Sequence, residues 1–280
     1  MISELGSGKV ALDYGPTQMV IQISGKGATT RLAREAAIYA VKLIGELAEV
    51  KGIAARPQRE LGDTAGLPEV LQRMVAAVRL SGDNDLTPLA AVAGAIADMT
   101  ADWLFGQGVP RCIVNNGGDI AVRLADHERV AVGVAPAIGR QPTHVLRLNA
   151  GDGIGGVTTS GTGGRSLSKG IATAATVLAG SAALADACST SIGNAVFAPH
   201  PAIRLARAED IDPATDIPGH LVVRDIGELP PDIIRAALAN GWQLAKQYRD
   251  RGIIRGSAIF IGDIAVTLPE DFLYPLENNK

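Results

Sequence analysis

The chain has 280 residues, enough for one large domain or two small ones with a substantial core. Hydrophobic residues make up 47% and aromatic residues 4%, so this composition describes a globular protein with a core mainly of Ala, Val, Leu and Ile. The net charge of -3 gives no electrostatic footprint for nucleic acid and no basic run suggests a membrane surface, so we exclude both as partners.

The N-terminus and the cysteines indicate a cytoplasmic protein. The first residues, MISELGSGKVALDYG, lack the basic and apolar regions of a secretory signal, and no apolar run reaches the ~20 residues that cross a bilayer. Cys112 and Cys188 lie in apolar or helical contexts without CxxC spacing. We therefore expect reduced, structural thiols and no zinc site.

The first part of the chain predicts a hairpin followed by helices. KVALDYGPTQMVIQIS alternates on either side of a Gly-Pro pair, as two paired strands do. Apolar residues recur at helical spacing from about 29 to 49, and residues 69–80 predict a second helix. Residues 51–68 are rich in loop-forming residues. Thr87-Pro88 is a good helix start and opens the Ala-rich stretch LAAVAGAIADMTADWLF.

After Pro110 the pattern changes to strands, with RCIVNN, DIAVRL, RVAVGVA and THVLRLN. The following stretch, GDGIGGVTTSGTGGRSLSKGIA, is too rich in glycine to predict regular structure. TAATVLA predicts a buried strand and SAALADACSTSIGN a helix. The tail predicts a strand, HLVVRDI, a long helix from residue 230, and a last strand pair, GSAIFIGDIAVTLP. Because the order lacks a regular βα alternation, it favours an α+β fold.

Five residues of turn chemistry, NNGGD, separate two apolar runs at residues 115–119. A tight turn needs only one or two such residues. The surplus favours a loop that approaches a ligand, with Gly117 and Gly118 leaving room and the asparagines or Asp119 supplying polar contacts. The alternative is a wide hairpin whose polar groups bond one another.

The segment LADACST places Asp186 and Thr190 four residues apart, on one helix face. Their oxygens suit one hard cation such as Mg²⁺, which completes its octahedral shell with water and substrate phosphates. The alternative is structural, with Asp186 favouring the helix dipole, Ser181 capping the helix and Thr190 bonding back to a carbonyl. Spacing alone favours the structural interpretation.

TTSGTGGRS, at residues 158–166, has the glycines and hydroxyls of an anion-binding loop. Arg165 is suited to contact a phosphate through two hydrogen bonds. The segment is no Walker loop, because no GK[ST] follows the glycines. The four histidines lie outside these motifs, so no Ser-His-Asp arrangement is visible.

These motifs together resemble the ApbE-like superfamily, the FAD:protein FMN transferases. The resemblance lies in VNNGGDIAV, in the TTSG element and in the order of TAATVLA, Ser181 and ADACSTS. That family has a GGD loop, an ATSG element and an ADALATA-type helix in this order. LAAVAGAIAD resembles its glycine-containing helix before the GGD strand. The chain is most similar to an uncharacterised cytoplasmic branch, and the resemblance covers most of its length.

The resemblance implies Mg²⁺ ligands at Asp186 and Thr190, with a backbone carbonyl near Val92 as a third. Such enzymes cleave the pyrophosphate of FAD with the help of Mg²⁺ and pass FMN to a Thr or Ser hydroxyl of a target protein. The residues implied to contact the flavin nucleotide lie in two loops, with Arg165 beside the second: Asn116, Gly117, Gly118 and Asp119, then Thr159, Ser160 and Gly161.

One segment departs from the family. Its transferases carry a His-Ile-Ile-Asp-Pro-like segment between the TSG element and the ADA helix, where this chain has GGRSLSKGIA. The first hypothesis is a divergent flavin-processing enzyme related to the FMN transferases. The alternatives are a non-catalytic flavin- or nucleotide-binding carrier or maturation partner, and an enzyme for a different ligand in the same pocket.

The fold implied by the resemblance is α+β and T-fold-like, a compact unit of two entwined halves with mostly antiparallel sheets flanked by helices. We expect one domain over residues 1–280, with halves at roughly 1–108 and 109–275. The pentapeptide GDIAV occurs twice, about half a chain apart, at 118–122 and 262–266, and we favour a chance repeat of common residues over duplication. The Ala-rich helices suit a homodimer.

Overall fold

The computed structural model describes residues 1–164 and 166–276. The chain divides into two compact units. Unit 1 comprises residues 1–130, 148–158 and 178–187, and unit 2 comprises residues 131–147, 159–177 and 188–280. The chain therefore passes between the units several times. The single domain with halves at 1–108 and 109–275 stays a prediction.

The strands of unit 1 form an antiparallel array. The predicted hairpin is confirmed, because Tyr14 pairs with Thr17 across the Gly15-Pro16 turn. The first strand of the array is not among those predicted from the sequence. In spatial order the strands are β1 (Ile2–Gly6), β2 (Lys9–Tyr14), β3 (Thr17–Ser24), β4 (Arg111–Asn116), β5 (Asp119–Leu124) and β8 (Gly156–Ser160).

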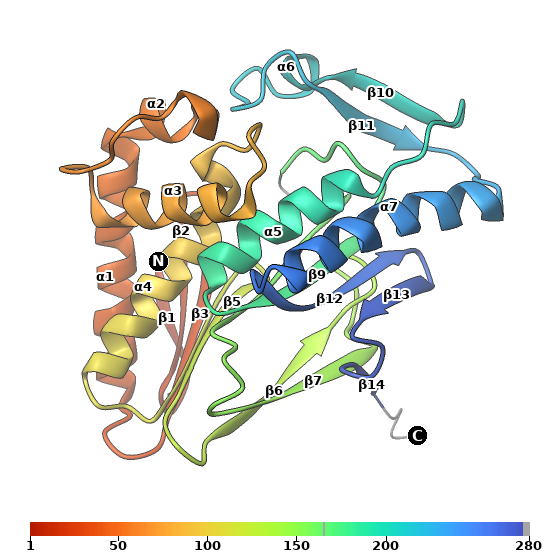
Figure 1. Ribbon diagram of the computed structural model, residues 1–280. Helices are drawn as coiled ribbons and strands as arrows, with labels where there is room; N and C mark the ends of the chain where they lie inside the picture. Colours follow the sequence, from red (N-terminus) through yellow and green to blue (C-terminus); the bar gives the residue numbers. More distant parts are fainter. Residues whose placement is uncertain (165, 277–280) are drawn as a thin grey trace. The chain divides into compact units, whose positions relative to one another are not determined.

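Two ends of the helices of unit 1 show ordinary capping chemistry. The Thr29 hydroxyl accepts a hydrogen bond from the Leu32 N–H (3.1 Å) at the start of α1, and Gly82, in the left-handed region, ends α3. α4 packs on β4 and β5, and α1, α3 and α4 lie together (Figure 1). The helices are α1 (Thr30–Glu49), α2 (Lys51–Ala54), α3 (Glu69–Ser81) and α4 (Val92–Gly106), with short 3₁₀ turns at Gln58–Glu60 and Pro88–Ala91.

Unit 2 contains antiparallel strand pairs, β10–β11, β12–β13 and β14–β7, and one long helix. α7 (Pro231–Asp250) packs on β12 and β13, and α5 (Ala182–Ala195) begins in unit 1 and ends in unit 2. The α+β class is confirmed. The strands lie in three groups: β14 (Tyr274–Pro275), β7 (His144–Asn149) and β6 (Arg129–Val134); β9 (Ala174–Ala179), β12 (Ile254–Ile261) and β13 (Ile264–Leu268); and β10 (Ile203–Arg207) with β11 (Leu221–Ile226), which the short helix α6 (Ala208–Ile211) joins.

The expectation that the glycine-rich stretch has no regular structure is wrong, because β8 lies within it. A Cβ at Gly156 would lie 2.2 Å from the Cα of Ala182, and one at Gly155 would lie 2.3 Å from the carbonyl oxygen of Gly180. A Cβ at Gly94 of α4 would lie 2.3 Å from the carbonyl oxygen of Ala182. These glycines therefore let β8 and α4 approach the start of α5 closely.

The two copies of GDIAV lie in two hairpins, but at different positions relative to the hairpin turn. In the β4–β5 hairpin Asn116 pairs with Asp119, so the aspartate is a strand residue. In the β12–β13 hairpin Ile261 pairs with Ile264, so Asp263 belongs to the turn. The repeated text is thus shifted by one residue, and Asp263 is an exposed counterpart of Asp119.

Both cysteines are buried and free. Burial raises the pKa of the Cys112 and Cys188 thiols to about 12. They are therefore thiols and not thiolates near neutral pH, as expected of structural cysteines.

One stretch among residues 1–164 and 166–276, Pro88–Gly106, is long and apolar enough to match a membrane span, with 19 residues and a mean hydropathy of 1.2. Within the protein 56% of that window is buried, and core helices of globular proteins commonly have this character.

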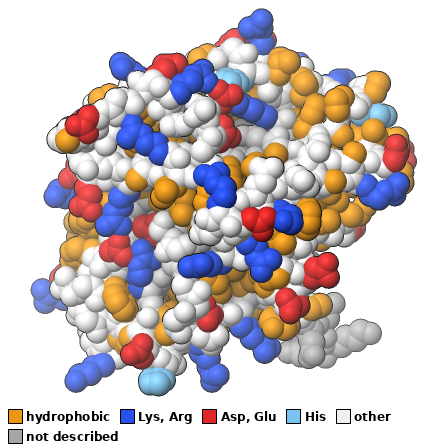
Figure 2. Space-filling view, viewed as in Figure 1, with side chains coloured by type: hydrophobic (Ala, Val, Ile, Leu, Met, Phe, Trp, Pro, Cys, Tyr) orange, Lys and Arg blue, Asp and Glu red, His pale blue; other side chains and the backbone are white. Residues whose placement is uncertain are grey.

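On the face shown in Figure 2, basic and acidic side chains are interspersed.

Gly94 tests the close approach of α4 and α5. We expect Gly94→Ala to lower the free energy of unfolding by about 2 kcal/mol, because its Cβ would meet the backbone of Ala182. Gly106→Ala is the control, since the added methyl group at the end of the same helix meets no described atom within 4 Å. Urea denaturation measures both, and a Gly94→Ala protein as stable as Gly106→Ala would contradict the packing.

Candidate functional site

Two aspartates join α4 and α5, because each helix supplies a carboxylate that bonds to the first turn of the other. The buried Asp98 of α4 accepts hydrogen bonds from the N–H groups of Ala182 (3.0 Å) and Ala183 (2.8 Å) at the start of α5. Asp186 of α5 accepts one from the N–H of Gly94 (3.0 Å) at the start of α4. A helix leaves the N–H groups of its first turn without partners, and these carboxylates satisfy them. The two helix starts are thereby fixed to each other.

Arg123 of β5 connects Asp98 to the sheet. Its guanidinium donates to Asp98 (2.9 Å), to Asp102 (2.7 Å) and to the carbonyl of Gly155 (3.0 Å). Burial raises the pKa of Asp98, while Arg123 and the two amides oppose the rise. Burial also acts to raise the pKa of Asp102, but hydrogen bonds from Arg123 and Arg73 outweigh it and hold that pKa below its ordinary value. A charged network therefore joins α3, α4 and β5.

The NNGGD residues form a hairpin with a two-residue turn. Gly117 and Gly118 have φ angles of 68° and 114°, which glycine adopts readily. The Gly118 N–H donates to the side-chain oxygen of Asn115 (2.8 Å). A Cβ at either glycine would meet none of the described atoms within 4 Å. The backbone conformation therefore accounts for both glycines, and the space beside them is open.

Three predicted residues meet at the start of α4. The side-chain amide of the buried Asn116 donates to the carbonyl of Ala93 (3.2 Å). Burial, repulsion from Asp119 and repulsion from Asp98 raise the pKa of Asp186 well above its ordinary value, and the N–H groups of Gly94 and Ala93 oppose the rise. Asn116 and Asp186 therefore contact the first turn of α4, and Asp119 lies beside Asn116 as its strand partner, all within unit 1.

The other predicted metal ligands lie on the same two helices. Val92 is the first residue of α4, directly before Ala93. Thr190 lies one turn after Asp186 on α5, in the part of that helix that belongs to unit 2. The Ser181 cap is present, because its hydroxyl accepts from the N–H of Leu184 (3.3 Å). Ligation by Asp186, Thr190 and Val92 stays a prediction.

The TSG residues belong to unit 2. Thr159 and Ser160 end β8, and the Thr159 hydroxyl bonds to that of Thr176 (2.8 Å). A Cβ at Gly161 would lie 2.6 Å from the carbonyl oxygen of Thr173, so close backbone packing accounts for this glycine. The contact of these three residues with a nucleotide stays a prediction.

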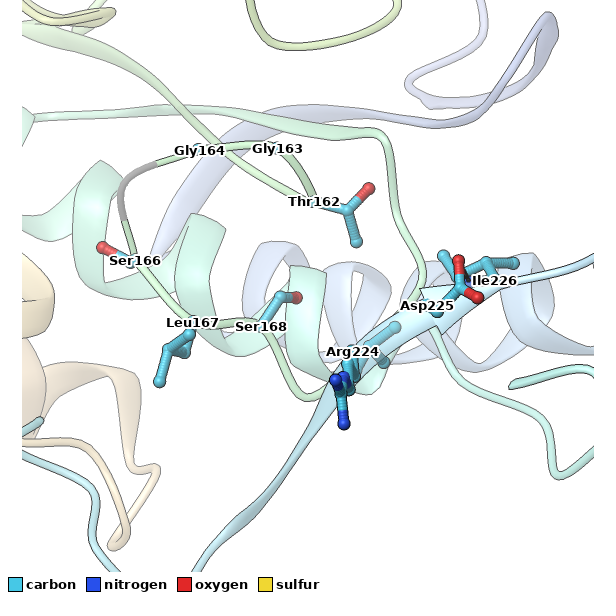
Figure 3. Close-up of a pocket in the computed structure, with 10 residues that line it drawn as sticks. Thr162, Gly163, Gly164, Ser166, Leu167, Ser168, Arg224, Asp225 and Ile226 are labelled. Carbon is cyan, nitrogen blue, oxygen red and sulfur yellow. Dashed lines mark hydrogen bonds between the residues drawn. The ribbon is translucent and has the colours of Figure 1, made fainter. Parts of the chain in front are cut away.

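The loop after Gly161 lines a pocket of about 320 Å³ in unit 2, together with residues 223–226 of β11 (Figure 3). The Val223 N–H donates to the carbonyl of Ser168 (2.8 Å), which joins the strand to the loop. The N–H and the hydroxyl of Thr162 both bond to the carbonyl of Ala172, so they serve the loop itself. Arg165, the predicted phosphate contact, lies outside the described residues.

Sequence reasoning missed Asp98 and Arg123. A signal was present, because Asp98 is the first of two carboxylates, with Asp102, in the apolar stretch LAAVAGAIADMTADWLF. An apolar helix buries a charge only when partners are provided for it. Identifying Arg123 as the partner required the pairing of helix and strand.

The family model described as AbpE bacteria matches residues 2–268 of the chain. Among curated relatives, a UPF0280 protein of Methanosarcina acetivorans is 39% identical over 142 residues, which are 50% of this chain and 53% of the relative. A UPF0280 protein of Methanothrix thermoacetophila is 35% identical over 170 residues, which are 59% of this chain and 68% of the relative. The chain thus spans about half the length of the first relative.

Two solved structures have similar folds. The apo flavinyl transferase ApbE of Pseudomonas stutzeri matches with a TM-score of 0.52 and 15% identity, over 95% of this chain and 94% of that one. The ApbE protein of Thermotoga maritima matches with a TM-score of 0.53 and 12% identity, over 96% and 97%. At these identities the similarity concerns the fold.

Asp98→Asn tests how the two helix starts are held. We expect it to lower the free energy of unfolding by about 3 kcal/mol, because a buried charge pair with Arg123 is broken and an amide has one accepting oxygen for two N–H groups. Chemical denaturation followed by circular dichroism measures the loss.

Asp102→Asn is the matched control. The substitution removes the second carboxylate on Arg123. Among the described residues Asp102 makes no hydrogen bond to α5, and its side chain is 37% exposed, so we expect a loss below about 1 kcal/mol. Equal losses in the two variants would contradict the special role of Asp98.

Proposed function

The chain belongs to the AbpE bacteria family, and on this basis we propose that it binds a flavin nucleotide with Mg²⁺ and processes it as an enzyme related to the FMN transferases. The observation that carries the proposal is the meeting of Asn116, Asp119 and Asp186 at the start of α4. The description of the Pseudomonas stutzeri protein as a flavinyl transferase supports flavin as the ligand class.

The groups that we propose as ligands carry the oxygen atoms that magnesium prefers. The Asp186 carboxylate, the Thr190 hydroxyl and the Val92 carbonyl are the proposed oxygen ligands. Among residues 1–164 and 166–276, no three His, Cys, Asp or Glu side chains form a metal-binding group, so the ion would take further ligands from water and phosphates, as Mg²⁺ commonly does. When bound, it would offset the negative charge of a pyrophosphate.

The chain's own groups would orient the nucleotide. We assign the first contact to Asn116, Gly117, Gly118 and Asp119, and support it with the open space beside the two glycines. We assign the second contact to Thr159, Ser160 and Gly161. Asp98 and Arg123 then act indirectly, because they hold the first turn of the helix that carries Asp186.

One observation favours a second function. Residues 162–172 contain no histidine, whereas the transferases that the sequence resembles carry one in this segment. A protein that retains the binding groups but lacks that histidine would act as a flavin or nucleotide carrier, or as a maturation partner of another enzyme. An enzyme for a different ligand in the same pocket is the third candidate.

We also propose a cytoplasmic location, a protein bearing a Thr or Ser hydroxyl as the acceptor of the transferred group, and a homodimer. The buried, reduced thiols support a reducing compartment. The Ala-rich helices support the homodimer. Light scattering and cell fractionation would test these two proposals.

Incubation of the purified protein with FAD and Mg²⁺, followed by chromatography of the nucleotides, tests the enzyme. We expect release of AMP, because transfer of FMN breaks the pyrophosphate of FAD. Tight binding without AMP favours the carrier. Absence of any binding of FAD would contradict both flavin proposals.

Asp186→Asn tests the cation. We expect calorimetry to show Mg²⁺ binding that needs a nucleotide, and at least about a tenfold weaker affinity in the variant, since hydrogen bonds and ligation involving a charged group contribute about 1.5–3 kcal/mol. The asparagine oxygen still accepts from the Gly94 N–H, so the helix contact is retained. Asp232→Asn, an exposed aspartate in the first turn of α7, is the control. Equal affinity in Asp186→Asn and wild type would refute the metal assignment.

A further inference from the structure

Thr158 presents a buried hydroxyl without a partner. Its side chain is fully buried, and among the described residues its Oγ1 has no hydrogen-bond partner. Buried hydroxyls are almost always bonded to protein, water or an ion, so such an atom points to a ligand. The Oγ of Ser257, in unit 2, is likewise buried without a hydrogen-bond partner among the described residues, and it offers a comparison.

The strand register places Thr158 opposite Asp119. Ile120 pairs with Val157 and Ala121 with Gly156 in the antiparallel pair β5–β8. Continuing this register by one residue brings Asp119 and Thr158 face to face. Directly opposite residues of antiparallel strands project to the same side of the sheet.

That side of the sheet is the one that α5 covers. The Cβ position of Gly156 lies against the backbone of Ala182, the first residue of α5. Thr158 is two residues further along β8, so its side chain projects to the same side. Asp186 lies one turn along α5 from Ala182, and its carboxylate accepts from the N–H of Gly94 in α4, the helix that packs on β5.

We propose that the Thr158 hydroxyl, together with the carboxylates of Asp119 and Asp186, receives a hydrated divalent cation. The proposal rests on the proposed function, in which Asp186 is a cation ligand, and it adds two groups that the sequence did not assign to the metal. All three residues belong to unit 1.

The chemistry suits the three groups. Mg²⁺ keeps several of its waters in proteins, and those waters donate hydrogen bonds outward. A carboxylate accepts such bonds, and a threonine hydroxyl both accepts and donates. The ATSG text of the resembling family has alanine at the place of Thr158, so this hydroxyl is a feature of the present chain.

Thr158→Val tests the proposal, because valine keeps the shape and removes the hydroxyl. Mg²⁺ is titrated calorimetrically into the protein with FAD present. We expect the affinity for Mg²⁺ to fall about three- to tenfold, the effect of one lost hydrogen bond, and Thr158→Ser to retain most of the affinity. Without FAD and Mg²⁺, the melting temperature of Thr158→Val should be unchanged or higher, since an unpaired buried hydroxyl has been removed.

Two controls match these variants. Ser257→Ala removes the other unpartnered buried hydroxyl and should leave the affinity for Mg²⁺ unchanged. Asp119→Asn should weaken Mg²⁺ binding about tenfold or more, the range for a charged partner, whereas Asp263→Asn, in the exposed copy of GDIAV, should not.

The outcomes separate the two proposals. Wild-type affinity in Thr158→Val, or a lower melting temperature of the ligand-free variant, overturns the role of Thr158 and leaves the proposed function standing. Failure of the wild-type protein to bind Mg²⁺ in the presence of FAD overturns the metal site in both proposals. Loss of affinity in Thr158→Val and Asp119→Asn, with both controls unchanged, supports the site.

Discussion

The site depends on a reciprocal contact between α4 and α5, in which a carboxylate of each helix accepts hydrogen bonds from N–H groups in the first turn of the other. Asp98 holds the first N–H groups of α5, and Asp186 holds that of Gly94 in α4. This contact requires the backbones of the two helices to lie against each other, so a side chain at Gly94 would overlap Ala182. It also demands a buried negative charge, which Arg123 balances from β5. The position of Asp186 follows from these contacts, because it lies one turn from the amides that Asp98 holds.

The site combines groups that serve stability with groups that oppose it. Asp98 and Arg123 form a paired, hydrogen-bonded network, and such a network stabilises the helix starts. Asp119 and Asp186 instead repel each other, and the hydroxyl of Thr158 has no partner among the described residues. Folding alone gives no reason to keep such groups together. Unfavourable local arrangements that persist in a folded chain are most common where a ligand binds.

Local patterns were sufficient to predict most elements. Alternation predicted β2 and β3, helical spacing predicted α1, residues 69–80 predicted α3, and the ADACST segment predicted α5 with its Ser181 cap. These succeed because strand and helix periods and end caps depend on neighbouring residues. β8 was missed for the opposite reason. Its glycines follow from contact with residues of the chain some twenty-five positions away, and no local rule distinguishes that use from a loop.

The sequence by itself determined the α+β class, the resemblance that the family match confirms, and the motifs that carry Asn116, Asp119 and Asp186. Only the tertiary structure decided which of those residues meet. The same five letters, GDIAV, place Asp119 in a strand beside α4 and Asp263 in an exposed turn, because the strand register differs by one residue. Likewise, Asp98 and Arg123 acquire their roles only once α4 lies on β5, since a buried charge is tolerable where a partner from elsewhere in the chain reaches it.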